Sequence, residues 1–498
     1  MGKSVQYSRR FLLTSLLSSV AGPALANAPL SSMRPKPRAT GYQPRQATPV
    51  EDVISASGLT GKVGFVVADA KTGKILESRN PVLSLPPASV TKSVTALYAL
   101  DALGSAHQFR TRLIADGAIS NGRLRGNLIL SGGGDPTLDT DGLGELARQL
   151  KAAGVREISG KFLVHSGSLP TITEIDPDQP DHVSYNPAIG GLNLNFNRVH
   201  FEWKRVSGKY SVVMDARARK FRPQVAIAKM RVVDRALPVY TYSSNGGRDQ
   251  WTVAKAALGK GGSRWLPVRK PELYVAEVFQ TLARSHGVVL PRASVSRSVP
   301  KGTVLVERKS APLREILRDM LRWSTNLTAE VVGLAASDAA GNTTRSLRGS
   351  AGEMSQWARR SLGTNKSKFV DHSGLGGASR MAAADMVRAL VKVHGRGELR
   401  SILKDIPMRN SKGEIVPGHP VKVHAKTGTL NFVSALAGYM TTADGRDLAF
   451  AIFSADLPRR EKVKRADGEA PQGGRAWTKR SRRLQLQLIE RWGAAFNS

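Results

Sequence analysis

The stretch PPASVTKSVTALYALDALG, residues 86–104, carries the most structural information in this chain of 498 residues. Two prolines end an extended segment, and the apolar run that follows predicts a buried helix from Ser89 to Gly104. Side chains three positions apart share one helix face, so the Lys92 amine can reach the Ser89 hydroxyl. Such spacing suits a serine nucleophile and its activating base. Taken alone, it also fits an N-cap serine followed by a solvated lysine.

A second motif far downstream supplies further polar groups for acyl transfer. An amphipathic helix is predicted over residues 313–321, and it leads to Ser324-Thr325-Asn326. Ser324 can relay a proton to a leaving amine, and Asn326 can offer its amide to a substrate backbone. The same residue types are also ordinary at the start of a helix, so this motif has no functional meaning alone.

The third motif, Lys426-Thr427-Gly428, lies in a segment, 421–429, whose alternation predicts a β-strand. Gly428 leaves one edge of this strand without a side chain, so a peptide can lie against the backbone there. The N–H groups of Thr429 and Ser89 would then form an oxyanion hole. Lys426 and Thr427 would hold a terminal carboxylate.

The proposed base must be neutral, whereas a free lysine is protonated at neutral pH. Desolvation lowers the pKa of a lysine, and so does a neighbouring cation. Lys426 is the expected neighbour of Lys92 if folding brings the motifs together. The three motifs therefore predict a buried site with two lysines.

With these motifs in this order, the chain resembles the class C low-molecular-mass penicillin-binding proteins, the D-alanyl-D-alanine carboxypeptidase/endopeptidase family. The resemblance runs from about residue 50 to the end and includes the segments 130–138, 191–197, 310–313, 371–375 and 436–439. Ser89 and Ser324 are 235 positions apart, whereas class A β-lactamases place the corresponding motifs only some tens of residues apart. A large insertion between these motifs is the mark of the class C group.

The resemblance implies an α/β (α+β) fold, in which a β-lactamase/transpeptidase-like catalytic domain, a sheet flanked by helices, carries a large two-domain insertion. The implied catalytic domain comprises 51–108 and 311–498, the inserted domain II comprises 109–175 and 263–310, and the nested domain III is 176–262. Short strands broken by turns predict that the nested domain is β-rich. The division of the insertion into two domains rests on the resemblance alone.

The N-terminal residues predict export. Residues 1–26 have a basic start, an apolar stretch and a small-residue cleavage site, which are the features of a secretory signal peptide. Arg9 and Arg10 also fit a twin-arginine signal, about as well as ordinary export. Residues 27–50 are rich in proline, arginine, threonine and glutamine and predict a flexible linker. We therefore expect a periplasmic protein.

The composition narrows the chemistry and the partners. The chain has no cysteine, which excludes thiol catalysis, disulfides and thiolate metal sites, and its histidines lack metal-ligand spacing, so we expect no metal and no cofactor. An excess of 74 basic over 39 acidic residues would suggest nucleic acid as a partner in a cytosolic protein. Export removes that partner and leaves anionic envelope polymers. Ordinary solubilising charge explains the excess equally well.

Two departures from the family pattern concern substrate recognition. The family usually has an aspartate, thought to hold the amino group of the substrate's diamino acid, where this chain has His165. After the 371–375 segment the family often has Ser-Arg, whereas this chain has Gly376-Gly377 and reaches Ser379-Arg380 three positions later. We expect complete acylation machinery and altered recognition of the peptide stem.

The expected function is that of a serine-type D-alanyl-D-alanine carboxypeptidase/endopeptidase, which acts on peptidoglycan stem peptides and is acylated by β-lactam antibiotics such as penicillins. We expect Ser89 to act as the nucleophile, Lys92 as its base and Ser324 as a proton relay. Asn326 and Thr427 would hold the substrate, and Lys426 would anchor its carboxylate. One alternative is a β-lactam-hydrolysing enzyme, although the loop glutamate of class A enzymes is not evident. The other is a weakly catalytic wall-binding scaffold, which the two departures favour.

Overall fold

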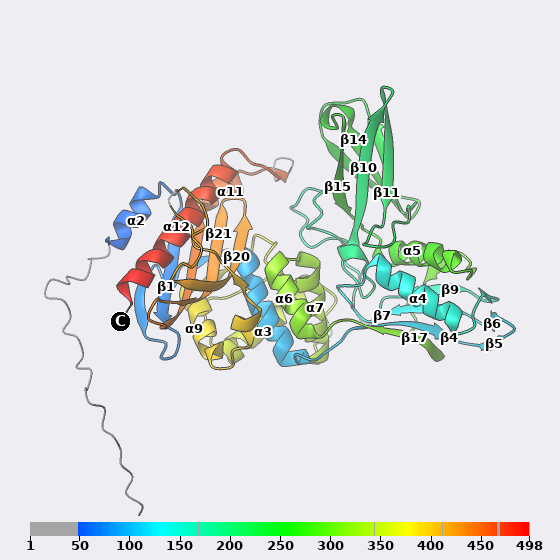
Figure 1. Cartoon of the computed structure of the whole chain (residues 1–498), viewed down its shortest axis with the longest axis horizontal. Coiled ribbons are helices and arrows are strands. Elements are labelled where there is room, and N and C mark those ends of the chain that lie inside the picture. Colours follow the sequence, from blue (N-terminus) through cyan, green and yellow to red (C-terminus); the bar gives the residue numbers. More distant parts are fainter. Residues whose placement is uncertain (1–47, 168, 343, 411, 466–468, 498) are drawn as a thin grey trace, which may run out of the picture. The chain divides into compact units, whose positions relative to one another are not determined.

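Figure 1 shows a computed structural model of the chain, which describes residues 48–498 except 168, 343, 411, 466–468 and 498. The signal peptide predicted at 1–26 lies outside the described residues, as does most of the predicted linker. The first described element is helix α2, Val50–Ala56. Among the described helices, none combines the length and the apolar character that crossing a membrane requires.

A six-stranded antiparallel sheet has the order β19-β20-β21-β22-β1-β2, so strands near the start of the chain pair with strands near its end. β1 pairs with β22 from Lys62 opposite Ala455 to Asp69 opposite Leu448. The strands are β1 (Lys62–Asp69), β2 (Ile75–Arg79), β19 (Lys404–Asp405), β20 (Lys422–Leu430), β21 (Val433–Thr441) and β22 (Asp447–Ala455).

Both faces of this sheet are buried, which explains why its central strands are almost continuously apolar. Side chains alternate between the two faces of a strand. Val66 of β1 packs on the side of α9, Ala383–His394. Phe65 packs on the side of α12, Gly474–Ala495, where its ring lies 5.5 Å from that of Trp492.

The helix predicted after Ser89 is present as a 3-10 turn, η1 (Ala88–Val90), followed by α3 (Thr91–Leu103). It ends at Gly104, which has a φ of +79°, the conformation that favours glycine at this position. Residues 91–99 are all buried, because α3 packs against other helices, chiefly α6 (Leu313–Trp323) and α7 (Asn326–Ala339) and also α8 (Leu347–Trp357). The remaining elements of this part are β3 (Ser84–Leu85), η4 (Ala358–Leu362), β18 (Met381–Ala382), α10 (Glu398–Ile402) and α11 (Leu457–Glu461).

The residues between α3 and α6 form a second apolar core around a five-stranded sheet of order β16-β9-β7-β4-β17. Its strands are β4 (Arg110–Ala115), β7 (Leu128–Gly132), β9 (Phe162–His165), β16 (Ala293–Val295) and β17 (Thr303–Lys309). Helices α4 (Thr140–Ala152) and α5 (Pro271–Ser285) pack against each other and against this sheet (Figure 1). Three short strands, β5 (Ala118–Ser120), β6 (Arg123–Arg125) and β8 (Glu157–Ile158), pair beside it.

Two three-stranded sheets, β11-β10-β15 and β12-β14-β13, occupy residues 198–267. Their strands are β10 (Arg198–Val206), β11 (Lys209–Asp215), β12 (Ala228–Val233), β13 (Tyr240–Asn245), β14 (Arg248–Ala254) and β15 (Gly261–Pro267). We propose domain limits that follow the sheets, with the nested domain extended from 262 to 267. The reason is that β15 pairs with β10 along its whole length. The mixed α/β architecture expected from the sequence is present.

Candidate active site

Ser89 lies in the tight turn between β3 and α3, and its Oγ is 3.0 Å from the Nζ of Lys92. Ala88, just before it, has a φ of +47°, a conformation that is rare for residues other than glycine. Gly374 makes this conformation possible, because a Cβ at that position would lie 1.9 Å from the Ala88 carbonyl oxygen. Tertiary packing therefore holds the Ser89 turn in a shape that its own sequence does not favour.

Lys92 is fully buried, and three acceptors surround its amine. Besides the Ser89 hydroxyl, Nζ contacts Asn326 Oδ1 at 2.7 Å and the Ser373 carbonyl at 2.8 Å. An ammonium has three N–H groups, whereas a neutral amine has two and a lone pair. A neutral Lys92 can thus keep two of these bonds and accept the proton of Ser89. Burial lowers the pKa of Lys92, which favours this neutral form.

Two buried carboxylates, Glu330 and Asp371, also act on Lys92, and sequence reasoning did not place them in the site. Their charges raise the pKa of Lys92 and so oppose the effect of burial. Glu330 accepts from the N–H groups of His372 at 2.9 Å and Ser373 at 2.8 Å. Asp371 accepts from two N–H groups further along the same loop. These bonds hold the loop whose carbonyl contacts the lysine.

Lys426 is the second buried lysine, and it brings Ser324 into the site. Its Nζ donates to Ser324 Oγ at 2.9 Å and to the Thr427 carbonyl at 2.7 Å. Burial lowers the pKa of Lys426 well below its ordinary value, and the charge of Lys92 lowers it further. The sequence predicts Lys426 as a cause of the lowered pKa of Lys92. In the structure, burial lowers the pKa of Lys92, and the charges that act on it are those of Glu330 and Asp371, so the predicted role of Lys426 is not found.

The third motif lies on β20, which passes close to the Ser89 turn. A Cβ at Gly428 would be 2.7 Å from the Pro87 carbonyl oxygen and 3.0 Å from the Ser89 nitrogen. The glycine is thus needed for this close approach, in addition to the free edge expected from the sequence. Within the described chain, β20 pairs from Lys426 onward with β21 alone, because β19 covers only the preceding residues.

Thr427 and Thr429 point to the face of the strand opposite to that of Lys426, because successive residues of a strand alternate between its faces. Thr427 is half-buried, whereas Thr429 is exposed. The Oγ1 of Thr429 accepts from a guanidinium nitrogen of Arg482 on α12 at 3.3 Å. Its side chain is therefore engaged elsewhere, and the expected oxyanion hole would use only its main-chain N–H.

A cleft of about 690 Å³ adjoins the Asp371 loop. Its walls come from residues 175–179, from residues 370–380, and from α11 with the residues that follow it. The charged side chains that line it include Asp176, Asp178, Arg380 and Arg460. Its volume is in the range of ligand-binding clefts, and its charges of both signs suit a peptide with free amino and carboxylate groups.

Comparisons with known proteins agree with this geometry. The family model of the D-Ala-D-Ala carboxypeptidase 3 (S13) family matches residues 46–472. The chain belongs to this family. D-alanyl-D-alanine carboxypeptidase DacB of Haemophilus influenzae is 26% identical over 425 residues, which cover 80% of this chain and 88% of that protein. A D-alanyl-D-alanine carboxypeptidase of an Actinomadura species is 26% identical over 442 residues, which cover 81% and 80%.

A solved structure confirms the fold class expected for a member of the carboxypeptidase 3 family. The crystal structure of penicillin binding protein 4 (dacB) from Haemophilus influenzae matches with a TM-score of 0.69 and 24% identity. The match covers 88% of this chain and 99% of that one. The transpeptidase-like architecture with inserted domains is therefore shared along nearly the whole length of the solved protein.

In this carboxypeptidase 3 family member, His165 ends β9 as a buried, neutral residue. Burial lowers its pKa. Its Nδ1 accepts from the N–H of Gly167 at 3.2 Å and lies 3.4 Å from Ser131 Oγ. Because Nδ1 accepts, the ring proton is on Nε2. The side chain brings no negative charge to the place where the family pattern has a carboxylate.

At the second departure from the family pattern, Gly376-Gly377, the second glycine lies beside an arginine side chain. A Cβ at Gly377 would lie 2.7 Å from Nη2 of Arg460 on α11. Arg380 donates to the carbonyls of Gly377 and Ser379 at 2.7 and 2.9 Å. Two guanidinium groups therefore lie along this wall of the cleft, and the absence of a side chain at 377 makes room for one of them.

Proposed function

We propose that this protein is a serine-type D-alanyl-D-alanine carboxypeptidase/endopeptidase that acts on peptidoglycan stem peptides. The observation that carries the proposal is the buried amine of Lys92, 3.0 Å from the Ser89 hydroxyl and held by Asn326 and Ser373. Membership of the D-Ala-D-Ala carboxypeptidase 3 family supports the substrate class. The cleft beside the Asp371 loop would take the rest of the stem peptide.

In the proposed reaction, neutral Lys92 takes the proton of Ser89 while Oγ attacks the carbonyl between the two terminal D-alanines. The N–H groups of Ser89 and Thr429 would stabilise the oxyanion, and a single such donor contributes roughly a hundred- to a thousandfold in rate. The proton passes to the leaving amine by way of Ser324 and Lys426, and the terminal D-alanine departs. Water, or an amine, then releases the peptide and restores the serine.

A β-lactam ring presents a similar carbonyl to Ser89, so penicillins would acylate the same oxygen. Rapid hydrolysis of that acyl-enzyme would need a second base that holds a water molecule. Glu330 is a buried glutamate close to Lys92 and is the candidate for such a base. Both of its carboxylate oxygens, however, already accept from main-chain N–H groups. We therefore favour the peptidase over the β-lactam-hydrolysing alternative.

The proposal includes an exported protein that works at the cell wall. The formal net charge of +35 would favour contact with anionic envelope polymers. A decrease in binding to purified sacculi as salt rises, with an unchanged rate on a small soluble peptide, would support this part of the proposal. Binding that does not change with salt would contradict it.

The test compares the wild-type protein with Ser89→Ala. The wild-type protein should take up a fluorescent penicillin and release fragments from purified sacculi whose masses show loss of D-alanine or cleavage of cross-links. Ser89→Ala should do neither and should unfold at the same temperature. Covalent label on the variant would mean that the nucleophile is misassigned. A labelled wild-type protein that leaves sacculi intact would favour the scaffold, and rapid release of hydrolysed penicillin would favour the β-lactam hydrolase.

A further inference from the structure

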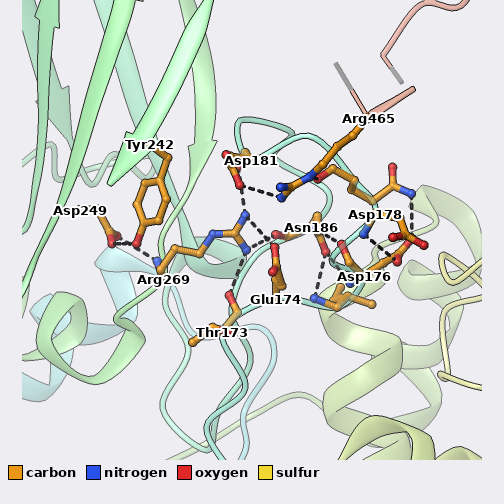
Figure 2. Close-up of polar contacts among 12 residues, drawn as sticks. Thr173, Glu174, Asp176, Asp178, Asp181, Asn186, Tyr242, Asp249, Arg269 and Arg465 are labelled. Atoms are coloured by element: carbon orange, nitrogen blue, oxygen red, sulfur yellow. Dashed lines mark hydrogen bonds and ion pairs between the residues drawn. The ribbon is translucent and has the colours of Figure 1, made fainter. Parts of the chain in front are cut away.

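Arg269 is a buried arginine between β15 and α5, and it gathers the loop of residues 173–186 around its guanidinium (Figure 2). Its Nη1 donates to the carbonyls of Thr173 at 2.9 Å and Asn186 at 2.7 Å. Its Nη2 donates to the Asp181 carbonyl at 3.0 Å and lies 3.6 Å from the carboxylate of Glu174. One side chain thus holds both ends and the middle of the loop.

The other end of Arg269 is fixed to the nested sheets. Its main-chain N–H donates to Asp249 Oδ2 at 2.9 Å, and Asp249 also accepts from the Tyr242 hydroxyl at 2.9 Å (Figure 2). Both partners lie on strands of the β12-β14-β13 sheet. The arginine therefore connects a rigid sheet to a loop that has no strand of its own.

Asn186 closes the same loop from the inside and is completely buried. Its Oδ1 accepts from the N–H groups of Ile175 and Asp176, both at 2.9 Å, and its Nδ2 donates to the Asp176 carbonyl at 2.9 Å. Its main-chain carbonyl is one of the acceptors of Arg269. Arg269 thus holds the peptide unit that follows Asn186. The neighbouring unit, between Tyr185 and Asn186, is fixed one residue away, where its N–H donates to the Val183 carbonyl at 3.1 Å.

This peptide unit reaches the active site through Asn326. Asn326 Nδ2 donates to the Tyr185 carbonyl at 2.9 Å, and Asn326 Oδ1 accepts from Lys92 at 2.7 Å. A carbonyl only accepts hydrogen bonds, and Lys92 donates to this amide both as an ammonium and as a neutral amine. The Tyr185 carbonyl therefore selects the one orientation of the Asn326 amide that turns its oxygen toward the lysine.

We propose that Arg269 is a positioning residue for acylation, which holds the Tyr185 carbonyl in place so that the Asn326 amide keeps its oxygen on Lys92. The proposal rests on the proposed function, because it assigns a cause to the geometry of the same Ser89 site. The planar fork of a guanidinium, permanently charged, suits the simultaneous grip on several carbonyls. A lysine in this place would carry all its donors on one atom and could not present two separate nitrogens to carbonyls that lie apart along the loop.

The experiment compares Arg269→Gln with Arg217→Gln, using acylation of the whole protein by a fluorescent penicillin. Arg217 is a matched control, because its guanidinium is also well bonded, to Asp215 and Glu202, but only within the nested strands. Misplacement of a catalytic group by about an ångström costs on the order of a hundredfold in rate. We expect the acylation rate constant of Arg269→Gln to fall roughly 10- to 100-fold, and that of the control to stay near the wild-type value.

The rate constant is read separately from the amplitude, since a destabilised protein loses amplitude while its folded molecules react at the normal rate. A second readout is the pH dependence of the rate constant. The charged groups facing Lys92 are Glu330, Asp371 and Lys426, and none of them is changed. When the Asn326 oxygen turns away, the ammonium form of Lys92 loses a hydrogen bond and the pKa of Lys92 falls. The acid limb of the profile, where the rate falls as Lys92 is protonated, should therefore move to lower pH in Arg269→Gln.

A third variant, Asn186→Ala, tests whether the loop is the route. Positions that act through one element are not additive, so the double variant should acylate no more slowly than the slower single variant. If the double variant shows the product of the two single effects, Arg269 does not act through this loop.

Each result supports or overturns the inference. A wild-type rate constant in Arg269→Gln, with only amplitude or thermal stability reduced, makes the residue merely structural. If Arg269→Gln does not fold, Arg269→Lys replaces it, and the same two readouts apply with a smaller fall in rate. If the wild-type protein takes no label at Ser89, the proposed function fails. If the wild-type protein and both variants acylate alike, only this inference fails.

Discussion

Lys92 and Arg269 are both buried basic side chains, with 0% and 6% of their surface exposed, but they lie in two regions with different surroundings. Lys92 faces the Ser89 hydroxyl, an amide and one carbonyl, whereas the guanidinium of Arg269 faces three carbonyls of one loop. Burial lowers the pKa of both groups. A lysine can lose its proton under this influence, whereas an arginine cannot. In the roles proposed above, the same burial therefore favours a neutral base at Lys92 and leaves a permanent positive charge at Arg269.

The nearby carboxylates differ in the same way. Glu330 and Asp371 are buried with Lys92 and raise its pKa, so they set the pH range in which it can act. Glu174, the carboxylate beside the Arg269 guanidinium, has 26% of its side chain exposed and lies 3.6 Å away. Arg269 stays protonated, so the charge of Glu174 does not change its protonation state. The carboxylates near Lys92 thus change its pKa, whereas the carboxylate near Arg269 only helps to hold the guanidinium in place.

The largest effect is expected when the base is made into a permanent cation. Lys92→Arg keeps the charge but cannot take the Ser89 proton, so penicillin acylation should fall by about a hundred- to ten-thousandfold, the usual contribution of a general base. Intact-protein mass at timed intervals measures the acylation rate. If Lys92→Arg acylates within tenfold of the wild-type rate, the contrast between the two cations is wrong.

A smaller effect is expected when the tuning charge is removed. Because Glu330 raises the pKa of Lys92, Glu330→Gln should lower that pKa and move the acid limb of the acylation profile to lower pH. The amide also places an N–H group against a main-chain donor, which costs about 1–3 kcal/mol of stability. Rate measurements from pH 5 to 9, beside thermal unfolding, check both parts.

The matched control for this prediction is Glu174→Gln, which removes the carboxylate beside Arg269. Arg269 does not titrate, so the acid limb should stay in place in this variant. An equal shift in both variants would mean that overall charge, and not the local environment of Lys92, sets the profile. A shift of Glu330→Gln to higher pH would contradict the assigned sign.

The parts of the site that depend on local spacing could be predicted from the sequence. The helix after Ser89 places Lys92 one turn away, and the alternation around Gly428 predicts β20. The contacts of Asn326 with the Tyr185 carbonyl could not be predicted, because they join segments far apart in the chain. Glu330 did carry a signal, since it is an acidic residue among apolar neighbours, four positions and thus one turn after Asn326.

In the fold, too, long-range contacts could not be predicted from local sequence patterns. The pairing of β1 with β22 has no local signal in the sequence, because apolar strands can pair in many orders. The positive φ of Ala88 is a second example. Alanine gives no hint of that conformation, which results from the approach of Gly374 and other distant residues. The resemblance to a known family supplied the topology that local patterns lack.

The smallest effect is expected at Arg460, a partly buried cation on the wall of the cleft whose Nη1 donates to the Asn431 carbonyl at 3.0 Å. Gly377→Ala would bring a methyl group within 2.7 Å of its Nη2, which is the far end of a flexible side chain and can move aside. We expect KM for a peptide substrate to rise about twofold, with penicillin acylation unchanged. The control is Gly352→Ala on α8, where a Cβ meets nothing within 4 Å and should only favour the helix. A tenfold rise in KM for Gly377→Ala, with no change for the control, would show that Arg460 cannot move aside. Its guanidinium would then be held as firmly as that of Arg269, and the contrast in exposure between the two arginines would have no consequence.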